Sequence, residues 1–519
     1  MTESGAALRR GQSLTAAALL LAGATALSRL LGYLREAVLA YRVGVGPETD
    51  AFRAAFQIPD LLNYFLAGGA LSIAFVPMVA ARLAEAGEEA ARGLLATVLG
   101  TTTCVAVIAT ALLFWQADAL VALQFPRFDP ETRELTIRLT RIVLPAQIAF
   151  VSGGIVRAAL MARRRFAAQA AAPLLYNAGI IAGGLLLAPG MGVEGFAWGA
   201  LVGAVAGPLL LGLVDLGRAG GLGFRVSFAD PDFLRYLRTA APLMLGLSLL
   251  TVDEWYDRYF GALQEAGTVA RLGYARMLMQ VPVAVVGQAL ATAALPVLAG
   301  LHRSGRRAEL EQVLGTTLAT GLGLAVLAGA ACVALAEPLV ALLYRRGAFV
   351  EADALAVARL LRVFALAVPG WVAQQIAVRA FYARGDTWRP MLLGTAFALA
   401  AVPLYLALGA RYGGAGLAAS GAIAISANAA ATLWLARRLH GAPPAAPLLA
   451  VLGRALAVAA PAVAAGWMAA GGLSRGGSPV ALALVVGGAG FGAVALPLAW
   501  WIGGPELRGG LRRLLVRCP

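Results

Sequence analysis

The residues of this chain most capable of chemistry are ionisable side chains inside long apolar segments. Arg29 and Glu36 lie seven residues apart, so a helix places them on one face, and Arg35 lies about 120° around the helix from Arg29. Asp50 and Arg53 follow at the start of the next segment. A charge at mid-bilayer costs about 2.5–3.5 kcal/mol even on insertion scales, so such groups face water or a partner. Two arginines against one glutamate favour an anion-binding wall, and a mutual structural ion pair is the alternative.

A second set of charges opens the second half of the chain. Asp253 and Asp257 are i, i+4 neighbours, and Arg276 lies inside the next apolar stretch. We expect Arg276 to meet Arg29 and Arg35 across a gap between the two halves. Three converging guanidiniums suit a diphosphate, because each planar fork donates paired hydrogen bonds to phosphate oxygens.

The composition is that of a membrane protein. Apolar residues make up 60% of the chain and charged residues 13%, with a mean hydropathy of +0.78. Soluble domains carry roughly 25% charged residues. The net charge is +15, but the arginines cluster mostly in short loops on one predicted side of the membrane. This is the positive-inside pattern, so we expect no nucleic-acid partner, and both termini should be cytoplasmic in an inner membrane.

Signals for enzymatic or metal chemistry are missing from the sequence. Cys104, Cys332 and Cys518 are scattered, no CxxC occurs, and the two histidines are isolated. Neither a metal site nor a disulfide framework is expected, and no cofactor is implied. The chain has no Walker P-loop, HExxH or GxSxG motif, and its loops are too short to hold a catalytic domain. An enzyme is therefore disfavoured.

The chain repeats itself at a spacing of about 220 residues. Ala70–Ser72 returns as Ala289–Ala291, and Leu120–Leu123 returns as Leu339–Leu342, each after 219 residues. Six spans per half give both halves the same orientation, with a substrate path between them. We predict an all-α fold with six-helix lobes over 1–220 and 221–440, followed by a helix pair over 441–519. The fourteen predicted spans lie near 13–42, 53–82, 93–117, 135–161, 168–188, 194–215, 237–262, 269–300, 311–335, 354–382, 389–409, 413–436, 449–470 and 479–502.

Prolines and a linker indicate where the chain bends. Pro145 of the first half corresponds to Pro369 of the second, and each is expected to kink its helix. The longest polar segment, Gly217–Arg238, joins the halves. We interpret it either as a link between two moving lobes or as an ordinary surface loop.

Several motifs resemble the MurJ/MviN lipid II flippases, a family of the multidrug/oligosaccharidyl-lipid/polysaccharide exporter superfamily. SRLLGYLRE at Ser28–Glu36 and TDAF at Thr49–Phe52 are similar to the opening of that family. LGYARMLMQVP at Leu272–Pro282, YRRGAF at Tyr344–Phe349 and RAFYARGDTWRP at Arg379–Pro390 resemble its second-half signatures. The resemblance extends from about residue 14 to 440 and implies fourteen helices, in agreement with our count.

The resemblance also implies a function and a set of site residues. It implies that lipid II, an anionic lipid-linked precursor, moves from the inner to the outer leaflet. Arg29 and Arg35 resemble the family's cavity arginines, and Glu36 and Asp50 resemble its acidic neighbours. By the same resemblance, the last two helices border a groove for the polyprenyl tail. Membrane lipids and cell-wall synthesis proteins are the implied partners of a monomer.

Several positions depart from the family pattern. The family's Ala-Glu-Gly-Ala reads Ala67-Gly68-Gly69-Ala70 here. Met277 stands where the family has an arginine, and Arg276 precedes it, so we expect Arg276 to take over that role. Some members carry a sodium site between helices seven, eleven and twelve. Asp257 matches its first part and is our candidate ion-coupling residue, whereas the eleventh span offers Thr395 as its oxygen ligand.

We therefore predict a flippase that works by alternating access, with Arg29, Arg35, Glu36, Asp50, Arg53 and Arg276 as substrate-binding residues. The alternatives are a flippase for another polyprenyl-linked oligosaccharide and a cation-coupled drug antiporter of the same superfamily. A third, from another class, is a membrane-embedded transferase that acts on polyprenyl phosphates.

Overall fold

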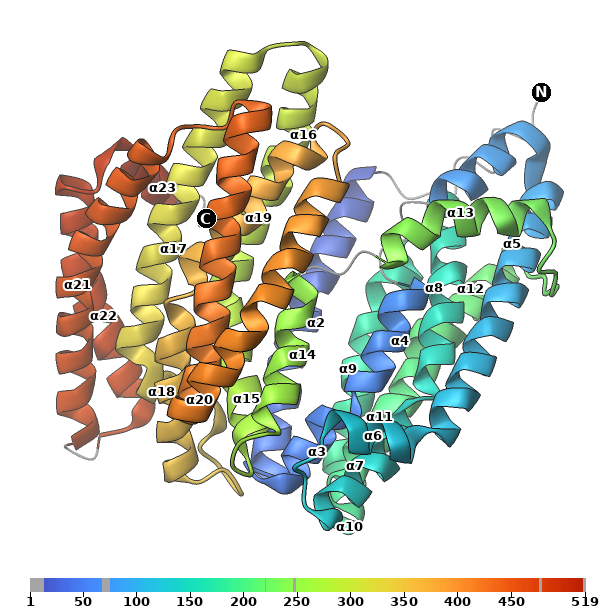
Figure 1. The fold of residues 1–519 in the computed structure, drawn as a ribbon, viewed down its shortest axis with the longest axis horizontal. Helices are drawn as coiled ribbons and strands as arrows, with labels where there is room; N and C mark the ends of the chain where they lie inside the picture. The colour runs from blue at the N-terminus through green and yellow to red at the C-terminus, as the bar shows by residue number, and fades with distance from the viewer. Residues whose placement is uncertain (1–13, 68–74, 220, 246–248, 476–477, 517–519) are drawn as a thin grey trace. The chain divides into compact units, whose positions relative to one another are not determined.

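The structure is a computed structural model that describes residues 14–67, 75–219, 221–245, 249–475 and 478–516. Every regular element in these ranges is a helix (Figure 1). The elements are α2 (Leu14–Arg42), α3 (Pro47–Ala55), α4 (Gln57–Ala67), α5 (Val76–Trp115), α6 (Ala117–Gln124), α7 (Pro130–Val143), α8 (Ala146–Ala162), α9 (Ala167–Leu186), α10 (Ala188–Met191), α11 (Glu194–Ala204), the π-helical η2 (Val205–Leu211), α12 (Gly212–Arg218), α13 (Pro231–Leu245), α14 (Leu249–Gly261), α15 (Thr268–Pro282), the π-helical η3 (Val283–Gln288), α16 (Ala289–Arg303), α17 (Arg307–Tyr344), α18 (Glu351–Ala365), α19 (Val368–Tyr382), α20 (Trp388–His440), α21 (Ala445–Arg475), α22 (Val480–Trp501) and α23 (Gly504–Val516).

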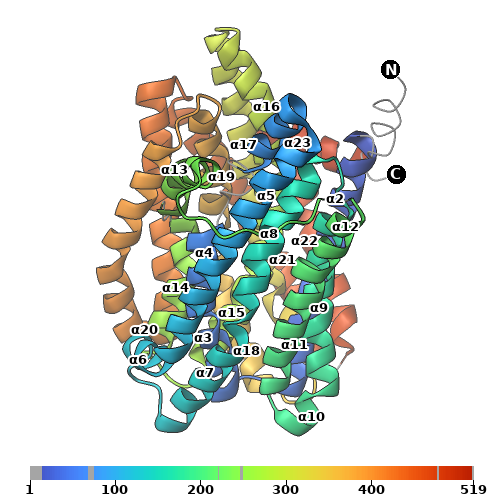
Figure 2. The same ribbon diagram turned by 90° about the vertical axis from the view of Figure 1, so that its right-hand side faces the viewer.

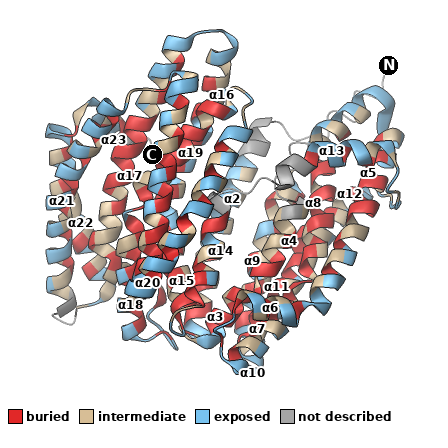
Figure 3. Ribbon diagram, viewed as in Figure 1, coloured by how far each residue is buried: buried red, intermediate tan, exposed pale blue. Residues whose placement is uncertain are grey.

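The predicted all-α membrane fold is confirmed, whereas the count of fourteen spans is not. Within the described ranges, nine helices are long and apolar enough to cross a membrane, or ten if the bent pair α18–α19 is one span. One cause of the lower count is α20, which runs through two predicted spans. Gly413 in α20 has a φ of 57°, so the helical geometry is interrupted there. Large apolar side chains such as Trp467 and Val485 stay exposed along the outer helices, as lipid contact requires (Figure 3).

The chain divides into two compact units, residues 1–246 and 247–519. The predicted seventh span, 237–262, covers parts of two described helices, of which α13 packs against α4 and α5 of the first unit and α14 packs in the second. Residues 246–248 of this span lie outside the described residues. The C-terminal helices α21 and α22 pack on each other and on α17, so they belong to the second unit. The division into parts at residues 220 and 440 stays a prediction.

Prolines interrupt matching helices in the two units. Pro145 stands at the break between α7 and α8, and Pro369 lies in the first turn of α19 after α18, where the helix axis bends by 42°. The repeat pairs these two prolines with each other. The repeat landmark Ala70–Ser72 lies outside the described residues, as does the family position Gly68–Ala70.

Glycines let α9 and α11 touch backbone to backbone in the first unit. A Cβ added to Gly183 would lie 2.3 Å from the Gly195 carbonyl oxygen, and one added to Gly179 would lie 2.6 Å from the Gly203 Cα. Real Cβ atoms do not approach so closely, so a larger residue at either position would push the helices apart. This contact fixes α9, which carries one member of the site below.

Candidate substrate-binding site

The predicted residues of the first helix are brought together at Glu36. This carboxylate is buried, with 5% of the residue exposed. Its Oε1 accepts a hydrogen bond from Arg35 Nη2 at 2.9 Å, and its Oε2 accepts one from Arg53 Nη2. Two guanidiniums therefore share one carboxylate, and the formal charges of the three groups sum to +1. We call Arg35, Glu36 and Arg53 the Arg–Glu–Arg cluster.

Packing of α3 places Arg53 beside α2. Thr49 Oγ1 donates to the Gly44 carbonyl at 2.9 Å, which ties the start of α3 to the turn after α2. Phe52 is 8% exposed, and its ring meets that of Phe196 on α11 edge to face at 6.0 Å. Burial of an aromatic ring is the main anchor of such a short helix. The neighbouring residue, Arg53, is thereby directed to Glu36.

Asn177 on α9 completes the cluster, and the sequence reading missed it. Its Oδ1 accepts from Arg35 Nη1 at 3.2 Å, while its Nδ2 lies 3.3 Å from Ser28 Oγ and 3.1 Å from the Pro173 carbonyl. Arg35 is thus held between a carboxylate and an amide. Its side chain keeps 27% of its surface exposed, against 7% for Glu36, so its guanidinium can contact a further ligand. The sequence feature that could have indicated this role is a lone asparagine within the apolar residues of α9.

Arg29 and Asp50, the other predicted residues of the first unit, lie on the same two helices. Arg29 is exposed on α2, about two turns before Glu36. Asp50 is 3% exposed in the first turn of α3. An acid in that turn interacts favourably with the positive end of the helix dipole.

Arg276 of α15 belongs to a different cluster, in the second unit. Its Nη1 donates to Asp253 Oδ2 and its Nε donates to Asp257 Oδ2, both on α14. The three residues are 5%, 2% and 5% exposed, and their formal charges sum to −1. We call them the Asp–Arg–Asp cluster. The approach of Arg276 to Arg29 and Arg35 stays a prediction.

Aromatic residues enclose the Asp–Arg–Asp cluster, and the sequence reading missed these as well. Tyr405 OH donates to Asp253 Oδ1 at 2.7 Å, and the Arg276 guanidinium lies 4.8 Å from the centre of the Phe364 ring. The Tyr405 ring stacks on that of Phe260 at 5.1 Å. A cation over an aromatic face is attracted by the ring quadrupole, so Phe364 stabilises the buried guanidinium.

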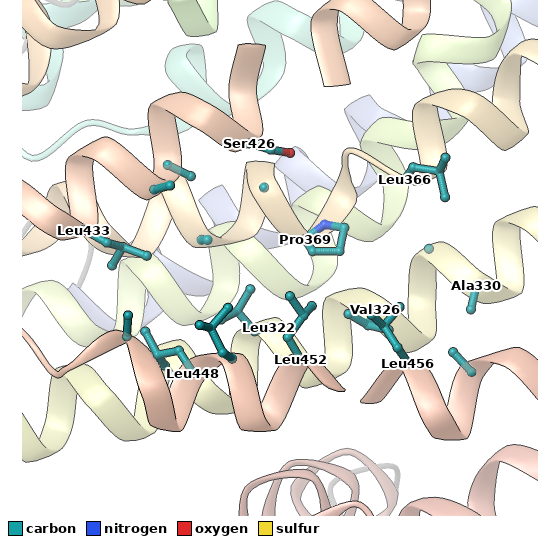
Figure 4. Close-up of a pocket in the computed structure, with 18 of the residues that line it drawn as sticks. Leu322, Val326, Ala330, Leu366, Pro369, Ser426, Leu433, Leu448, Leu452 and Leu456 are labelled. Atoms are coloured by element: carbon teal, nitrogen blue, oxygen red, sulfur yellow. The ribbon is translucent and has the colours of Figure 1, made fainter. Parts of the chain in front are cut away.

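An apolar pocket of about 790 Å³ lies elsewhere in the second unit (Figure 4). Leucine, valine and alanine side chains of α17, α20 and α21 line most of it, together with Pro369 of α19. Among the described residues that line it, Arg437, in the last turn of α20, is the one that carries a charge. The resemblance predicts a groove beside the last two helices, and this pocket is bordered by α21. No group of three or more potential metal ligands occurs in the described part of the chain.

Comparison with known proteins identifies the family. The profile of the family described as "Lipid II flippase MurJ" matches residues 39–484. The chain is a member of this family. The "Probable lipid II flippase MurJ" of Rhizobium meliloti (strain 1021) is 30% identical over 425 residues, 78% of this chain and 77% of the relative. The "Lipid II flippase MurJ" of Burkholderia cenocepacia is 31% identical over 386 residues, 72% of this chain and 74% of the relative.

Solved structures show the same fold. The structure described as "Lipid II flippase MurJ, inward closed conformation" matches with a TM-score of 0.76 and 20% identity, over 96% of this chain and 100% of that one. An inward-facing multidrug resistance MATE family transporter matches with a TM-score of 0.65 and 17% identity, over 80% of this chain and 94% of that one. Together with the apolar helices, the family makes the chain a multi-pass membrane protein.

Proposed function

We propose that this chain translocates lipid II from the inner to the outer leaflet by alternating access. The observation that carries the proposal is the Arg–Glu–Arg cluster, where two guanidiniums share one buried carboxylate and Arg35 stays partly exposed. A positive site of this kind suits a diphosphate. The names of the curated relatives support lipid II as the cargo.

We assign each site residue a role in this cycle. Arg29, Arg35 and Arg53 bind the diphosphate, Glu36 holds the latter two guanidiniums in place, and Asp50 positions α3. Arg276 is the substrate-binding residue that we assign in the second unit. Its Nε and Nη1 bond to Asp257 and Asp253, so its Nη2, which has no hydrogen-bond partner in the structure, would bond to the substrate.

The apolar pocket of the second unit receives part of the polyprenyl tail. Its lining is almost entirely aliphatic, and burial of apolar surface contributes about 25 cal/mol per Å². The head would cross the membrane while the tail stays among apolar side chains and lipid. The membrane potential contributes about 2.3 kcal/mol per elementary charge per 100 mV. Because the potential is negative inside, it favours the outward movement of an anionic head group.

Ion coupling through Asp257 is a further part of the proposal. The Asp–Arg–Asp cluster has one negative charge in excess, and burial makes an uncompensated charge costly. A cation that enters the cluster would neutralise it. Because Arg276 already occupies one oxygen of Asp257, entry of the cation and release of Arg276 would be linked.

The remaining parts of the proposal concern the cellular setting. The chain would lie in the cytoplasmic (inner) membrane with both termini in the cytoplasm, as the arginine-rich loops favour. It would act as a monomer among membrane lipids, with cell-wall synthesis proteins as its neighbours. It would be a transporter and not an enzyme, in line with the family to which it belongs.

Rescue of a bacterial strain depleted of its own lipid II flippase tests the proposal. The wild-type chain is expected to restore growth and lipid II at the outer leaflet. A chain that is present in the membrane at normal levels but restores neither would contradict the proposal. If another polyprenyl-linked oligosaccharide accumulates at the outer leaflet instead, the cargo is that lipid.

A cation-coupled drug antiporter is the second candidate, and the Asp–Arg–Asp cluster is the observation that favours it. Paired buried acids are suited to bind cations. Vesicles that contain the protein and a proton or sodium gradient distinguish the two functions. Loss of the gradient on addition of a drug would support the antiporter. A gradient that stays stable would argue against the antiporter and favour the flippase.

A further inference from the structure

The polar linker of the first unit is an extended segment strapped across α5. The Arg225 amide donates to the Ala96 carbonyl at 3.0 Å, and the Ser227 amide donates to Thr101 Oγ1 at 2.9 Å. A Cβ on Gly100 would lie 2.3 Å from the Arg225 carbonyl oxygen, so glycine is needed for this close approach. We call residues 221–230 the strap. Figure 2 shows it as the thin green segment that runs from α12 across α5 and α8 to α13.

Alternate side chains of the strap form an exposed apolar row. Leu222, Phe224, Val226 and Phe228 are 47%, 63%, 46% and 52% exposed. The residues between them are Gly223, Arg225 and Ser227. The backbone amides of Arg225 and Ser227 bond to α5. An extended chain directs successive side chains to opposite sides, so this alternation gives the strap one apolar face. A linker surrounded by cytosol would gain nothing from four large apolar side chains at every second position.

The helix that follows the strap has the same two-sided character. Tyr236 and Phe233 of α13 are buried, and the Tyr236 ring meets that of Phe75 edge to face at 5.8 Å. The outer face carries Leu234 and Leu237, which are 37% and 41% exposed, beside exposed arginines. Arginine and leucine on one outward face are typical of a helix that lies in a membrane interface, because the long arginine stems extend to the head groups.

Arginines in excess of their acidic partners surround this surface. Arg225 pairs with Asp230 at 2.8 Å, and Arg82 pairs with Asp232 at 2.7 Å. Asp230 and Asp232 are thus already neutralised. Four further exposed arginines make no ion pair with any residue in the described part of the chain, and they are Arg92, Arg218, Arg235 and Arg238. Their charge complements an anionic surface.

The depth of the strap agrees with the edge of the hydrocarbon. Its contacts Ala96 and Thr101 lie three and eight residues after residue 93, where the predicted span 93–117 begins. At 1.5 Å per residue these points are about 5 and 12 Å inside the predicted span. Arg163, which bonds Glu88 at 2.9 Å, is the first of three consecutive arginines, Arg163–Arg165, and such clusters mark the predicted cytoplasmic side.

We propose that the strap and α13 form an interfacial element that embeds in the anionic lipid surface of the cytoplasmic leaflet. The apolar row contacts acyl chains, and the unpaired arginines contact lipid phosphates. The segment that joins the two repeats is then neither a free tether nor a cytosolic loop. It is an anchor that couples the first unit to the charge of the leaflet, and it is independent of the cargo.

Spin labels along the strap test the placement. Single cysteines replace Leu222, Phe224 or Val226 in full-length protein in which Cys104, Cys332 and Cys518 are changed to alanine, in phosphatidylglycerol/phosphatidylcholine vesicles. Val485→Cys is the lipid-facing reference, and exposed Ser304→Cys is the water reference. Strap labels are expected to match Val485→Cys, with high oxygen and low nickel-chelate accessibility. The proposal would be overturned if the oxygen and nickel-chelate accessibilities of the strap labels equalled those of Ser304→Cys. It would also be overturned if the spectrum of a strap label were broadened by a label on a second copy of the protein.

Lipid-dependent unfolding tests the contribution of charge. Phosphatidylglycerol added to the detergent-solubilised protein should raise its Tm more than phosphatidylcholine does, because a ligand of the folded state stabilises it. Arg235→Gln and Arg238→Gln should each lose part of this shift, whereas the matched control Arg303→Gln should keep it. Equal shifts with the two lipids, or an equal loss in Arg303→Gln, would overturn the proposal.

Discussion

The Arg–Glu–Arg cluster of the first unit and the Asp–Arg–Asp cluster of the second are opposite in charge. The first places two arginines on one acid and the second places two acids on one arginine, with formal charges that sum to +1 and −1. They also differ in burial. The Arg35 side chain is 27% exposed, whereas that of Arg276 is 6% exposed.

This difference indicates separate roles for residues that the sequence groups together. A partly exposed guanidinium with one shared acid can bind a phosphate, as Arg35 is placed to do. A fully enclosed guanidinium between two acids is first of all a structural partner, because its removal would strand two buried charges. The account therefore expects substitutions in the first cluster to impair transport and substitutions in the second to impair folding.

The largest expected effect is that of Arg276→Ala. It leaves Asp253 and Asp257 buried without their cation, which should cost about 3–5 kcal/mol of unfolding free energy. Thermal unfolding in detergent measures the loss. The matched control is the triple variant Asp253→Asn/Asp257→Asn/Arg276→Gln, which removes all three charges and should recover most of the stability. An Arg276→Ala protein as stable as wild type would remove the distinction between the clusters.

Tyr405→Phe is expected to have the next largest effect. It deletes the hydroxyl that donates to Asp253 Oδ1 at 2.7 Å, and a hydrogen bond to a charged group contributes about 1.5–3 kcal/mol. The Tm should fall while the ring packing on Phe260 is kept. Tyr412→Phe, at an exposed ring of α20, is the control and should leave the Tm unchanged. Equal Tm values for the two variants would argue against the role of Tyr405.

Arg35→Lys separates charge from hydrogen-bond geometry in the first cluster. Lysine keeps the positive charge beside Glu36 but lacks the planar fork that bonds a phosphate bidentately. The Tm should stay within error of wild type, and transport should fall about tenfold, equivalent to about 1.4 kcal/mol. Arg42→Lys, at the end of the same helix, is the control for transport of lipid II. Full transport by Arg35→Lys would mean that charge alone suffices.

Asp129 gives a small effect outside both clusters and serves as a baseline. Its side chain caps α7 and accepts from the Thr132 amide at 3.0 Å, and the bonds from Thr132 hold the pKa of Asp129 below its usual range. Asp129→Ala should cost about 1 kcal/mol at neutral pH. A lowered pKa stabilises the folded state above pH of about 4 and the effect disappears as the pH falls through that pKa. The Tm gap between wild type and Asp129→Ala should therefore close in acid, whereas the gap between Asp129→Asn and Asp129→Ala should not change with pH, because neither side chain titrates.

The sequence predicted the fold class and named all three residues of the Arg–Glu–Arg cluster as candidates, because apolar windows and charges within them are visible as local patterns. Apolar windows identify membrane helices one at a time. The seven-residue spacing of Arg29 and Glu36 places them on one face, and the excess of arginine over glutamate near Glu36 is visible in the sequence. The repeat also pairs Pro145 with Pro369, and both stand where one helix ends and the next begins.

The remaining features depend on how distant segments pack. Asn177 lies 142 residues from Arg35, and Tyr405 lies 152 residues from Asp253, so no periodicity connects them. Arg276 shows the same limit, since the rotation of α15 relative to α14 decides which side chains it meets. The residues of α13 and α14 were predicted as one span, because their packing in different units depends on contacts with distant helices.

The most direct test of the central claim is the amount of lipid II at the outer leaflet in flippase-depleted cells that express Arg29→Ala/Arg35→Ala. Glu36 keeps Arg53 in this variant, so the protein should fold and reach the membrane at the level of an Arg42→Ala control. The account predicts that outer-leaflet lipid II is lost in the double variant and retained in the control. Wild-type levels in the double variant would contradict the account.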